Sequence, residues 1–142
     1  MTELADIRAG LAANLNTALS GIQCTGYLLG SPTAPGFEIE LHPNGVGFDR
    51  AMGRGLDEWF MIVRGYVASN LDLAAQKKLD LWLASSGATS VKAAIEADRT
   101  LGINDVDCVV TEATGYRQYT VASAPNVTYL GAEWTIRVLA PG

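Results

Sequence analysis

The first twenty residues carry an apolar stripe with helical spacing. Apolar side chains recur at every third or fourth position, at Leu4, Ile7, Leu11, Leu15, Ala18 and Leu19. This repeat places them on one side of an amphipathic helix, and Ser20-Gly21 indicates where that helix ends. We expect the stripe to be covered by a sheet or by a partner.

Three segments in the first half of the chain have the patterns of strands. Residues 22–27 predict a short strand. Residues 37–41 alternate strictly, so Phe37, Ile39 and Leu41 should face inward while Glu38 and Glu40 form an acidic outer face. Residues 56–68 are apolar on both faces, which indicates a strand in the middle of a sheet.

Residues 42–55 interrupt this pattern with four glycines, one proline and two arginines. Glycine adopts many backbone conformations at little steric cost, so a long flexible connection is predicted here. Long loops in small domains are often functional, which makes this segment a candidate for contacts with partners.

Two helices are predicted after the central strand. An apolar side with helical spacing indicates a helix that Asn70 or Asp72 can cap and that runs to about residue 84. Ser90 is a good cap for a shorter helix over residues 91–98. Both helices therefore stand between strands in the chain order.

Strand patterns resume at residues 106–113, 116–121 and 129–139, and Pro125 interrupts the approach to the last of them. The order of elements indicates one α+β domain spanning residues 1–142. We expect a mostly antiparallel sheet of about five strands, with an N-terminal helix and two helices inserted between strands.

Composition limits the functions that such a domain can have. The chain is 49% hydrophobic and 18% charged, with a formal net charge of −5, which argues against a free-standing nucleic-acid binder. It has no apolar run long enough to span a bilayer and no basic leader, so no membrane partner and a cytosolic site of synthesis are expected. Cys24 and Cys108 lack metal or redox spacing and are expected to be buried and reduced.

No catalytic, cofactor or metal site can be assembled from the motifs. His42 is the only histidine, and before Pro43 it is best explained as an exposed turn residue. Residues 104–107 lack the glycine and glutamate of a calcium loop, and the glycine pairs of residues 45–55 complete no phosphate-binding motif. We therefore expect a protein that is not an enzyme and that has no cofactor.

Three stretches together resemble the tail terminator proteins of long-tailed, siphovirus-type phages that infect actinobacteria. The middle stretch is the most informative, because a long strand is followed by two helices and a Thr-Leu-Gly turn. The segments are Asp6-Ile7-Arg8-Ala9-Gly10-Leu11, then Arg64-Gly65-Tyr66-Val67 with residues 72–79, 86–96 and 100–102, and finally Tyr129-Leu130-Gly131-Ala132-Glu133-Trp134.

The resemblance implies a structural virion protein in the neck region of the tail, made in the host bacterial cytoplasm. Such a protein forms a homo-hexameric ring that stops polymerisation of the tail tube protein and joins the tail to head-completion or connector proteins. DNA passes through the lumen of the ring without specific binding, and no cofactor is implied.

Candidate interface residues follow from loop length and from unpaired charge. Phe48, Arg50 and Arg54 in the glycine-rich segment are the first candidates for ring contacts, followed by the Glu38/Glu40 face and Arg117. A head-closure adaptor or a tail tube subunit remains an alternative, because such components share this size and class. A small-molecule-binding or enzymatic domain, with residues 42–55 as a lid, is a further alternative.

Overall fold

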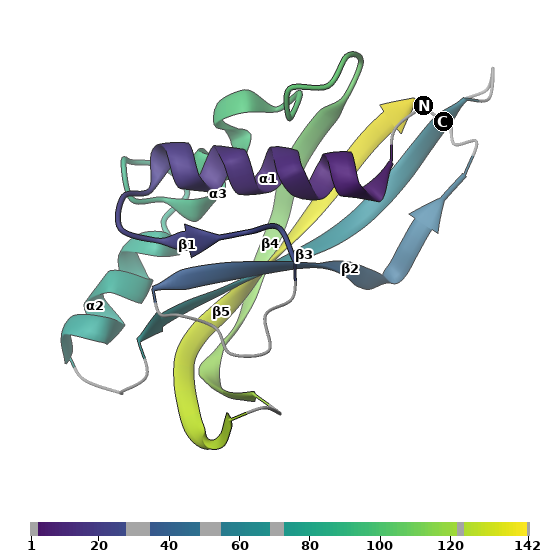
Figure 1. Cartoon of the computed structure of the whole chain (residues 1–142). Helices are drawn as coiled ribbons and strands as arrows, with labels where there is room; N and C mark the ends of the chain where they lie inside the picture. Colours follow the sequence, from purple (N-terminus) through teal and green to yellow (C-terminus); the bar gives the residue numbers. More distant parts are fainter. Residues whose placement is uncertain (1–2, 28–34, 49–54, 69–72, 122–123, 142) are drawn as a thin grey trace.

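One five-stranded sheet with helices packed on it makes up the described part of the chain. The computed structural model describes residues 3–27, 35–48, 55–68, 73–121 and 124–141. The strands lie in the spatial order β1-β2-β3-β5-β4 (Figure 1). The elements follow one another as α1 (Leu4–Ala18), β1 (Gln23–Cys24), β2 (Gly36–Gly47), β3 (Leu56–Ala68), α2 (Leu73–Trp82), α3 (Val91–Ile95), the 3₁₀ helix η1 (Glu96–Asp98), β4 (Asp107–Val121) and β5 (Ala124–Pro141).

The sheet is mixed. β1 pairs in parallel with β2, whereas the β2–β3, β3–β5 and β4–β5 pairs are antiparallel. The predicted α+β class and the three helices are confirmed, but the expectation of a mostly antiparallel sheet is corrected. Residues 25–35 separate β1 from β2, and a connection of this length can bring the chain back to run in the same direction. An alternating pattern reports the faces of a strand and not its direction.

β3 is the central strand, as its pattern predicts. It pairs with β2 on one side and with β5 on the other, and Met61 and Val63 are fully buried. The helices pack on the face of the sheet to which these two side chains point. Their buried residues join one core with it, namely Ile7, Leu11 and Leu15 of α1, Ala75, Leu79 and Trp82 of α2, and Val91, Ala94 and Ile95 of α3.

Three aromatic side chains connect α2 to the sheet within this core. The ring of Phe37 lies 4.7 Å from that of Trp82 and 6.2 Å from that of Trp134, centroid to centroid. Large rings in such tilted contacts bury much apolar surface and stabilise the packing beyond area alone. The second predicted helix is thereby held against both β2 and β5.

The predicted flexible segment 42–55 is wrong in its first half. β2 continues to Gly47, and Val46 and Gly47 pair with Trp59 and Glu58 after a register shift. Gly45 has a φ of +67° in this shift, so the glycine serves an irregular strand and not a loop. His42 is correspondingly a strand residue and not a turn residue. Residues 49–54 lie outside the described part.

Two further boundaries differ from the sequence pattern. The strands predicted at residues 106–113 and 116–121 form one strand, β4, with register shifts on either side of Gly115, whose φ is +68°. β5 begins at Ala124, so Pro125 lies within it and does not precede it. Irregular pairing within a long hairpin carries both residues without ending the strands.

The predicted cap of the third helix is confirmed. The Ser90 side chain accepts a hydrogen bond from the backbone N–H of Ala93 at 3.1 Å and donates to the carbonyl of Ala84 at 2.5 Å. One side chain thus starts α3 and fixes the end of the preceding segment. Asn70 and Asp72, the proposed caps of α2, lie outside the described residues.

No helix in the described ranges is long and apolar enough to cross a membrane. This finding agrees with the composition.

Gly10 allows α1 to approach the turn at Leu101. A Cβ added at Gly10 would lie 2.5 Å from the Leu101 Cβ and 2.6 Å from the Leu101 carbonyl oxygen. Leu101 is buried with a φ of +53°, a left-handed conformation that is rare for a leucine. The surrounding packing, and Gly10 in particular, must hold it there.

We therefore expect Gly10→Ala to destabilise the protein. Alanine is favoured over glycine by about 1 kcal/mol in a helix, but the clash with Leu101 reverses this gain and costs about 2 kcal/mol net. Urea denaturation followed by circular dichroism measures the change. Ala13→Gly, on the exposed side of α1, serves as the control and should cost about 1 kcal/mol from propensity alone. A Gly10→Ala variant as stable as the parent would contradict the contact.

Candidate functional site

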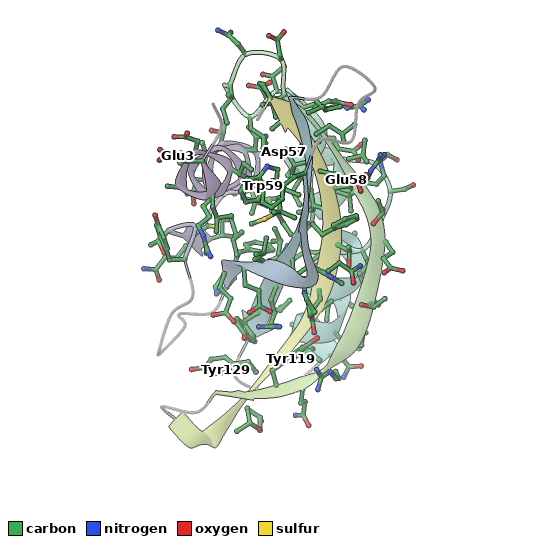
Figure 2. The ribbon with its side chains drawn as sticks, turned by 90° about the vertical axis from the view of Figure 1, so that its right-hand side faces the viewer. Glu3, Asp57, Glu58, Trp59, Tyr119 and Tyr129 are labelled. Carbon is green, nitrogen blue, oxygen red and sulfur yellow. The ribbon has the colours of Figure 1, made fainter. Side chains whose placement is uncertain are left out.

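A row of charged residues crosses the sheet on the face that the helices do not cover. Glu38 of β2 stands opposite Arg64 of β3, Arg64 stands opposite Glu133 of β5, and Glu133 stands opposite Thr114 of β4. Side chains that are cross-strand neighbours point to the same face, so the register alone brings these groups together. Figure 2 shows the sheet edge-on, with α1 on one side of it.

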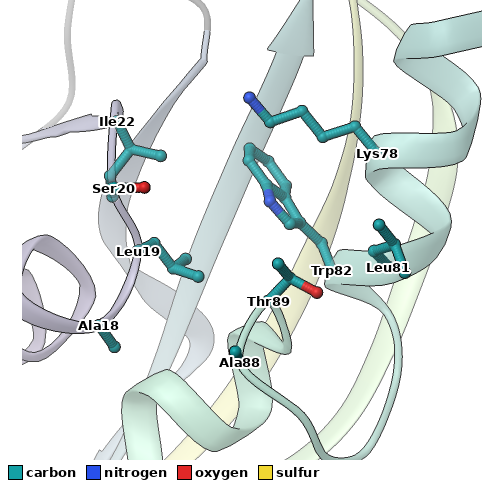
Figure 3. A pocket seen from close by; sticks show the side chains of 9 residues that line it. All are labelled: Ala18, Leu19, Ser20, Ile22, Lys78, Leu81, Trp82, Ala88 and Thr89. Atoms are coloured by element: carbon teal, nitrogen blue, oxygen red, sulfur yellow. The ribbon is translucent and has the colours of Figure 1, made fainter.

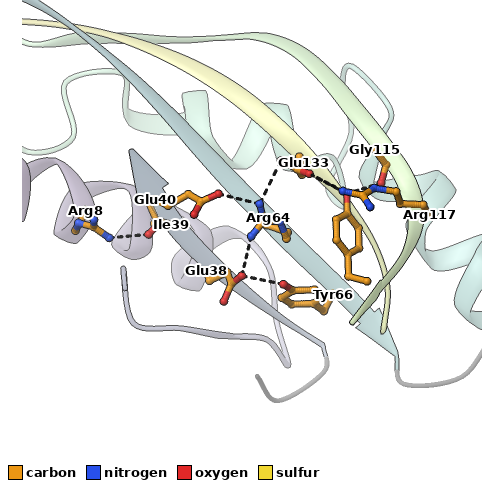
Figure 4. Close-up of polar contacts among 10 residues, drawn as sticks. Arg8, Glu38, Ile39, Glu40, Arg64, Tyr66, Gly115, Arg117 and Glu133 are labelled. Carbon is orange, nitrogen blue, oxygen red and sulfur yellow. Dashed lines mark hydrogen bonds and ion pairs between the residues drawn. The ribbon is translucent and has the colours of Figure 1, made fainter. Parts of the chain in front are cut away.

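The Arg64 guanidinium is the centre of this row. Its Nη1 lies 3.0 Å from Glu38 Oε1, and its Nη2 lies 2.8 Å from Glu40 Oε1 and 3.4 Å from Glu133 Oε2 (Figure 4). The side chain is 18% exposed and that of Glu38 only 7%. Three carboxylates thus share one largely buried cation, an arrangement in which removal of the cation is costly.

Two tyrosines extend the network. The Tyr66 hydroxyl donates a hydrogen bond of 2.8 Å to Glu38 Oε1, and the Tyr119 hydroxyl lies 2.5 Å from the Gly115 carbonyl and 3.1 Å from Glu133 Oε1. The Tyr66 and Tyr119 rings meet edge to face at 5.8 Å. These rings, with that of Tyr129, form a small second core that shields the carboxylates from water.

Arg117 completes the set at its exposed margin. Its guanidinium stacks over the Tyr119 ring at 4.3 Å and lies 3.7 Å from Glu133 Oε1. The side chain is 63% exposed, so its ion pair contributes little to stability. We call Arg64, Arg117, Glu38, Glu40, Glu133, Tyr66 and Tyr119 together the Arg64 cluster.

The electrostatics of the Arg64 cluster favour its charged and hydrogen-bonded form. Burial by itself lowers the pKa of Arg64, but the carboxylates of Glu133, Glu40 and Glu38 outweigh this effect and raise the pKa above its ordinary value. Burial raises the pKa of the Tyr66 hydroxyl, and the Glu38 carboxylate that accepts its hydrogen bond raises it further. Arg64 therefore stays charged and Tyr66 stays neutral over the range in which proteins are folded.

This geometry favours binding and structural roles over catalysis. Arg64 occupies the space between the carboxylates, which a metal ion would need, and within the described ranges no three His, Cys, Asp or Glu side chains come together as a metal site. The cluster holds one more carboxylate than it has guanidinium groups, so the face is mildly acidic.

Three of the six interface residues predicted from sequence converge here. Glu38 and Glu40 meet through Arg64, and Arg117 joins them through Glu133. The prediction that Glu38 faces outward is correct for its direction only, because Arg64 and Tyr66 bury it to 5% exposure. Leu41, expected to face the core, is 37% exposed, because it lies at the shift where β2 leaves its regular register.

The other three predicted residues do not join the cluster. Phe48 follows the end of β2 and is 67% exposed. Arg50 and Arg54 lie outside the described residues, so the structure does not test them.

Sequence reasoning did not single out Arg64 or Glu133 as site residues. A signal for Arg64 was present, since it is the only basic residue in the apolar run 56–68, and an isolated charge there needs a partner. Its partners could not be named without the strand order, because Glu133 is 69 residues away in the chain.

The two cysteines are free and buried, as expected. Burial, and then the nearby carboxylates, raises the pKa of Cys108 to about 12, so its thiol is not poised to react. Neither cysteine belongs to the site.

Substitution of Arg64 should destabilise the fold strongly. We expect Arg64→Met to lower the free energy of unfolding by about 3 kcal/mol, because it leaves buried carboxylates without a cation. Adding Glu38→Gln to this variant should recover part of the loss. The control is Arg117→Gln, which should cost less than about 1 kcal/mol because Arg117 is exposed. Chemical denaturation at neutral pH measures all three, and equal effects of the two arginines would contradict the central position of Arg64.

The tyrosines of the cluster predict a loss of stability in alkali. Burial, and then the carboxylate of Glu133, raises the pKa of Tyr119 to about 12, so the folded protein holds this proton more tightly than the unfolded chain does. The resulting stability is complete below about pH 10 and is lost as the pH rises toward 12.

Phenolate absorbance during a native titration tests this directly. One of the five tyrosines should ionise near pH 12, and Tyr119→Phe should remove that phase. Tyr27→Phe, at an exposed position, should leave it in place. A native titration without a late phase would show that the Tyr119 hydroxyl is not held as described.

Comparison with known proteins identifies no relative. No protein-family model matches the chain, and no curated protein matches it. A proposal for its function therefore rests on the sequence pattern and on the geometry of the sheet.

Proposed function

We propose that this chain is a structural subunit of a phage tail, a tail terminator that acts as a homo-hexameric ring. The ring caps the tail tube, ends its polymerisation and joins the tail to the head-completion proteins. The sequence resemblance over three stretches supports this proposal. The observation that carries it in the structure is a sheet with one bare, mildly acidic face and one open edge.

The open edge belongs to β4, which is the last strand of the sheet. Its beginning is closed, since the N–H of Val110 donates to Glu96 Oε2 at 2.8 Å and the N–H of Cys108 donates to the Arg99 carbonyl at 2.9 Å. From Glu112 onward no described residue pairs with this edge. Unpaired edges bind other strands readily, which suits a protein that works as an assembly.

The bare face suits a lumen. Glu38, Glu40 and Glu133 are held in place by Arg64, and Glu112 shares their face because it stands opposite Thr135, two residues from Glu133 on β5. A surface with excess carboxylates repels the phosphates of DNA at short range. DNA could then slide through the ring without binding to it.

Electron microscopy of particles assembled with and without this chain tests the function. Without it, tails of uncontrolled length that lack heads are expected, and adding the chain back should restore both length and attachment. Tails of normal length without heads would favour a head-closure adaptor instead, and the absence of any tube would favour a tube subunit. Normal, headed tails would contradict a role in the tail.

A further inference from the structure

A hollow lies at the end of the molecule formed by α2 and the C-terminal end of α1. Its volume is about 400 Å³. The walls come from three places, namely residues 18–22 after α1, residues 78–82 of α2 and the turn at residues 88–89 (Figure 3). Benzene fits a cavity of about 150 Å³, so this hollow has room for an aromatic side chain.

The lining of the hollow favours an apolar side chain with an acid beside it. Trp82 is almost fully buried, whereas Leu81 at the rim is 55% exposed. Lys78 is the only charged residue of the lining, and its Nζ lies 5.8 Å from the centre of the Trp82 ring. A large apolar group would cover Leu81 and Trp82, and a neighbouring carboxylate would pair with Lys78.

The opposite end of the molecule presents such a group. Phe48 is the most exposed of the large hydrophobic side chains in the described part of the chain, at 67%. It follows Gly47, which stands opposite Glu58 on β3. Glu58, Asp57 and Glu3 lie together at this end (Figure 2). An exposed aromatic ring is thus accompanied by carboxylates.

These two features cannot meet within one copy. β2 ends on the right in Figure 1, whereas α2 and the C-terminal end of α1 lie on the left. A contact between them must join one copy to the next through two different surfaces. Contacts of this kind repeat from copy to copy and close into a ring when the rotation per copy allows it.

We propose that Phe48 of one copy inserts into the hollow between α1 and α2 of the next. The partner for this surface is a second copy of the chain, and the inference rests on the proposed ring function and deepens it. Phe48 buries its ring against Trp82 and Leu81, and Lys78 faces the acidic end of the neighbour. The contact is apolar at its centre and charged at its rim, as in most protein interfaces.

Cysteine pairs placed across the contact test it in assembled tails. Phe48→Cys and Leu81→Cys are combined in one chain, and particles carrying it are oxidised. A disulfide needs Cβ atoms about 4 Å apart, so linked ladders of the chain should form only if the two sites meet. The matched control is Phe48→Cys with Leu73→Cys, because Leu73 is exposed on α2 but does not line the hollow; it should form no ladder.

A second variant separates assembly from folding. Phe48→Ser should leave the thermal unfolding of the isolated chain unchanged, because Phe48 is exposed, and should abolish incorporation into tails. If tails terminate normally, the cysteines do not link and Phe48→Ser is incorporated as well as the parent, this contact is wrong while the ring function stands. If the chain is absent from the particles, the ring function fails and the contact fails with it.

Discussion

The register of β3 between its two neighbours is the constraint on which the rest of the molecule depends. A shift of one residue would turn Arg64 toward Trp134 and the helices, and would bring Met61 and Val63 to the bare face. Neither arrangement is tolerable, since the first buries a cation in an apolar layer and the second exposes the core. Arg64 and its carboxylates therefore do more than contribute attraction. They penalise every alternative pairing of the sheet, a role for which buried ion pairs are better suited than for adding net stability.

The two faces of the sheet divide the work of the chain. On one face, three helices and the rings of Phe37, Trp82 and Trp134 make a core that needs no partner. On the other face, the charged row is held almost rigidly although no described helix covers it. A surface that is ordered before assembly loses little entropy when it meets a partner. In the proposed ring, this would let the same face keep its shape whether or not neighbouring copies are present.

Periodicity predicted the elements well and their relations poorly. The spacing of Ile7, Leu11 and Leu15 was sufficient for α1, and the two-sided apolar pattern of residues 56–68 was sufficient for the central strand. The glycines of residues 45–47 misled, because glycine marks both loops and irregular strands, and only pairing with Trp59 and Glu58 distinguishes them. The candidate site was half visible. Glu38, Glu40 and Arg117 stood out as charges on strands, but the residue that joins them depends on strand order, which local patterns do not encode.

The position of β5 in the chain has a consequence for the time course of synthesis. β3 cannot gain its second neighbour until β5, which begins at residue 124, has been made. The amide of Asn14 on α1 bonds the carbonyls of Ile95 and Asp98, more than 80 residues later. At bacterial rates of translation, about 5–20 residues per second, the apolar stripe of α1 waits about 5–20 seconds for its cover. Nascent chains on one ribosome after another would carry this uncovered helix, which makes it the segment through which a chaperone would first meet the protein.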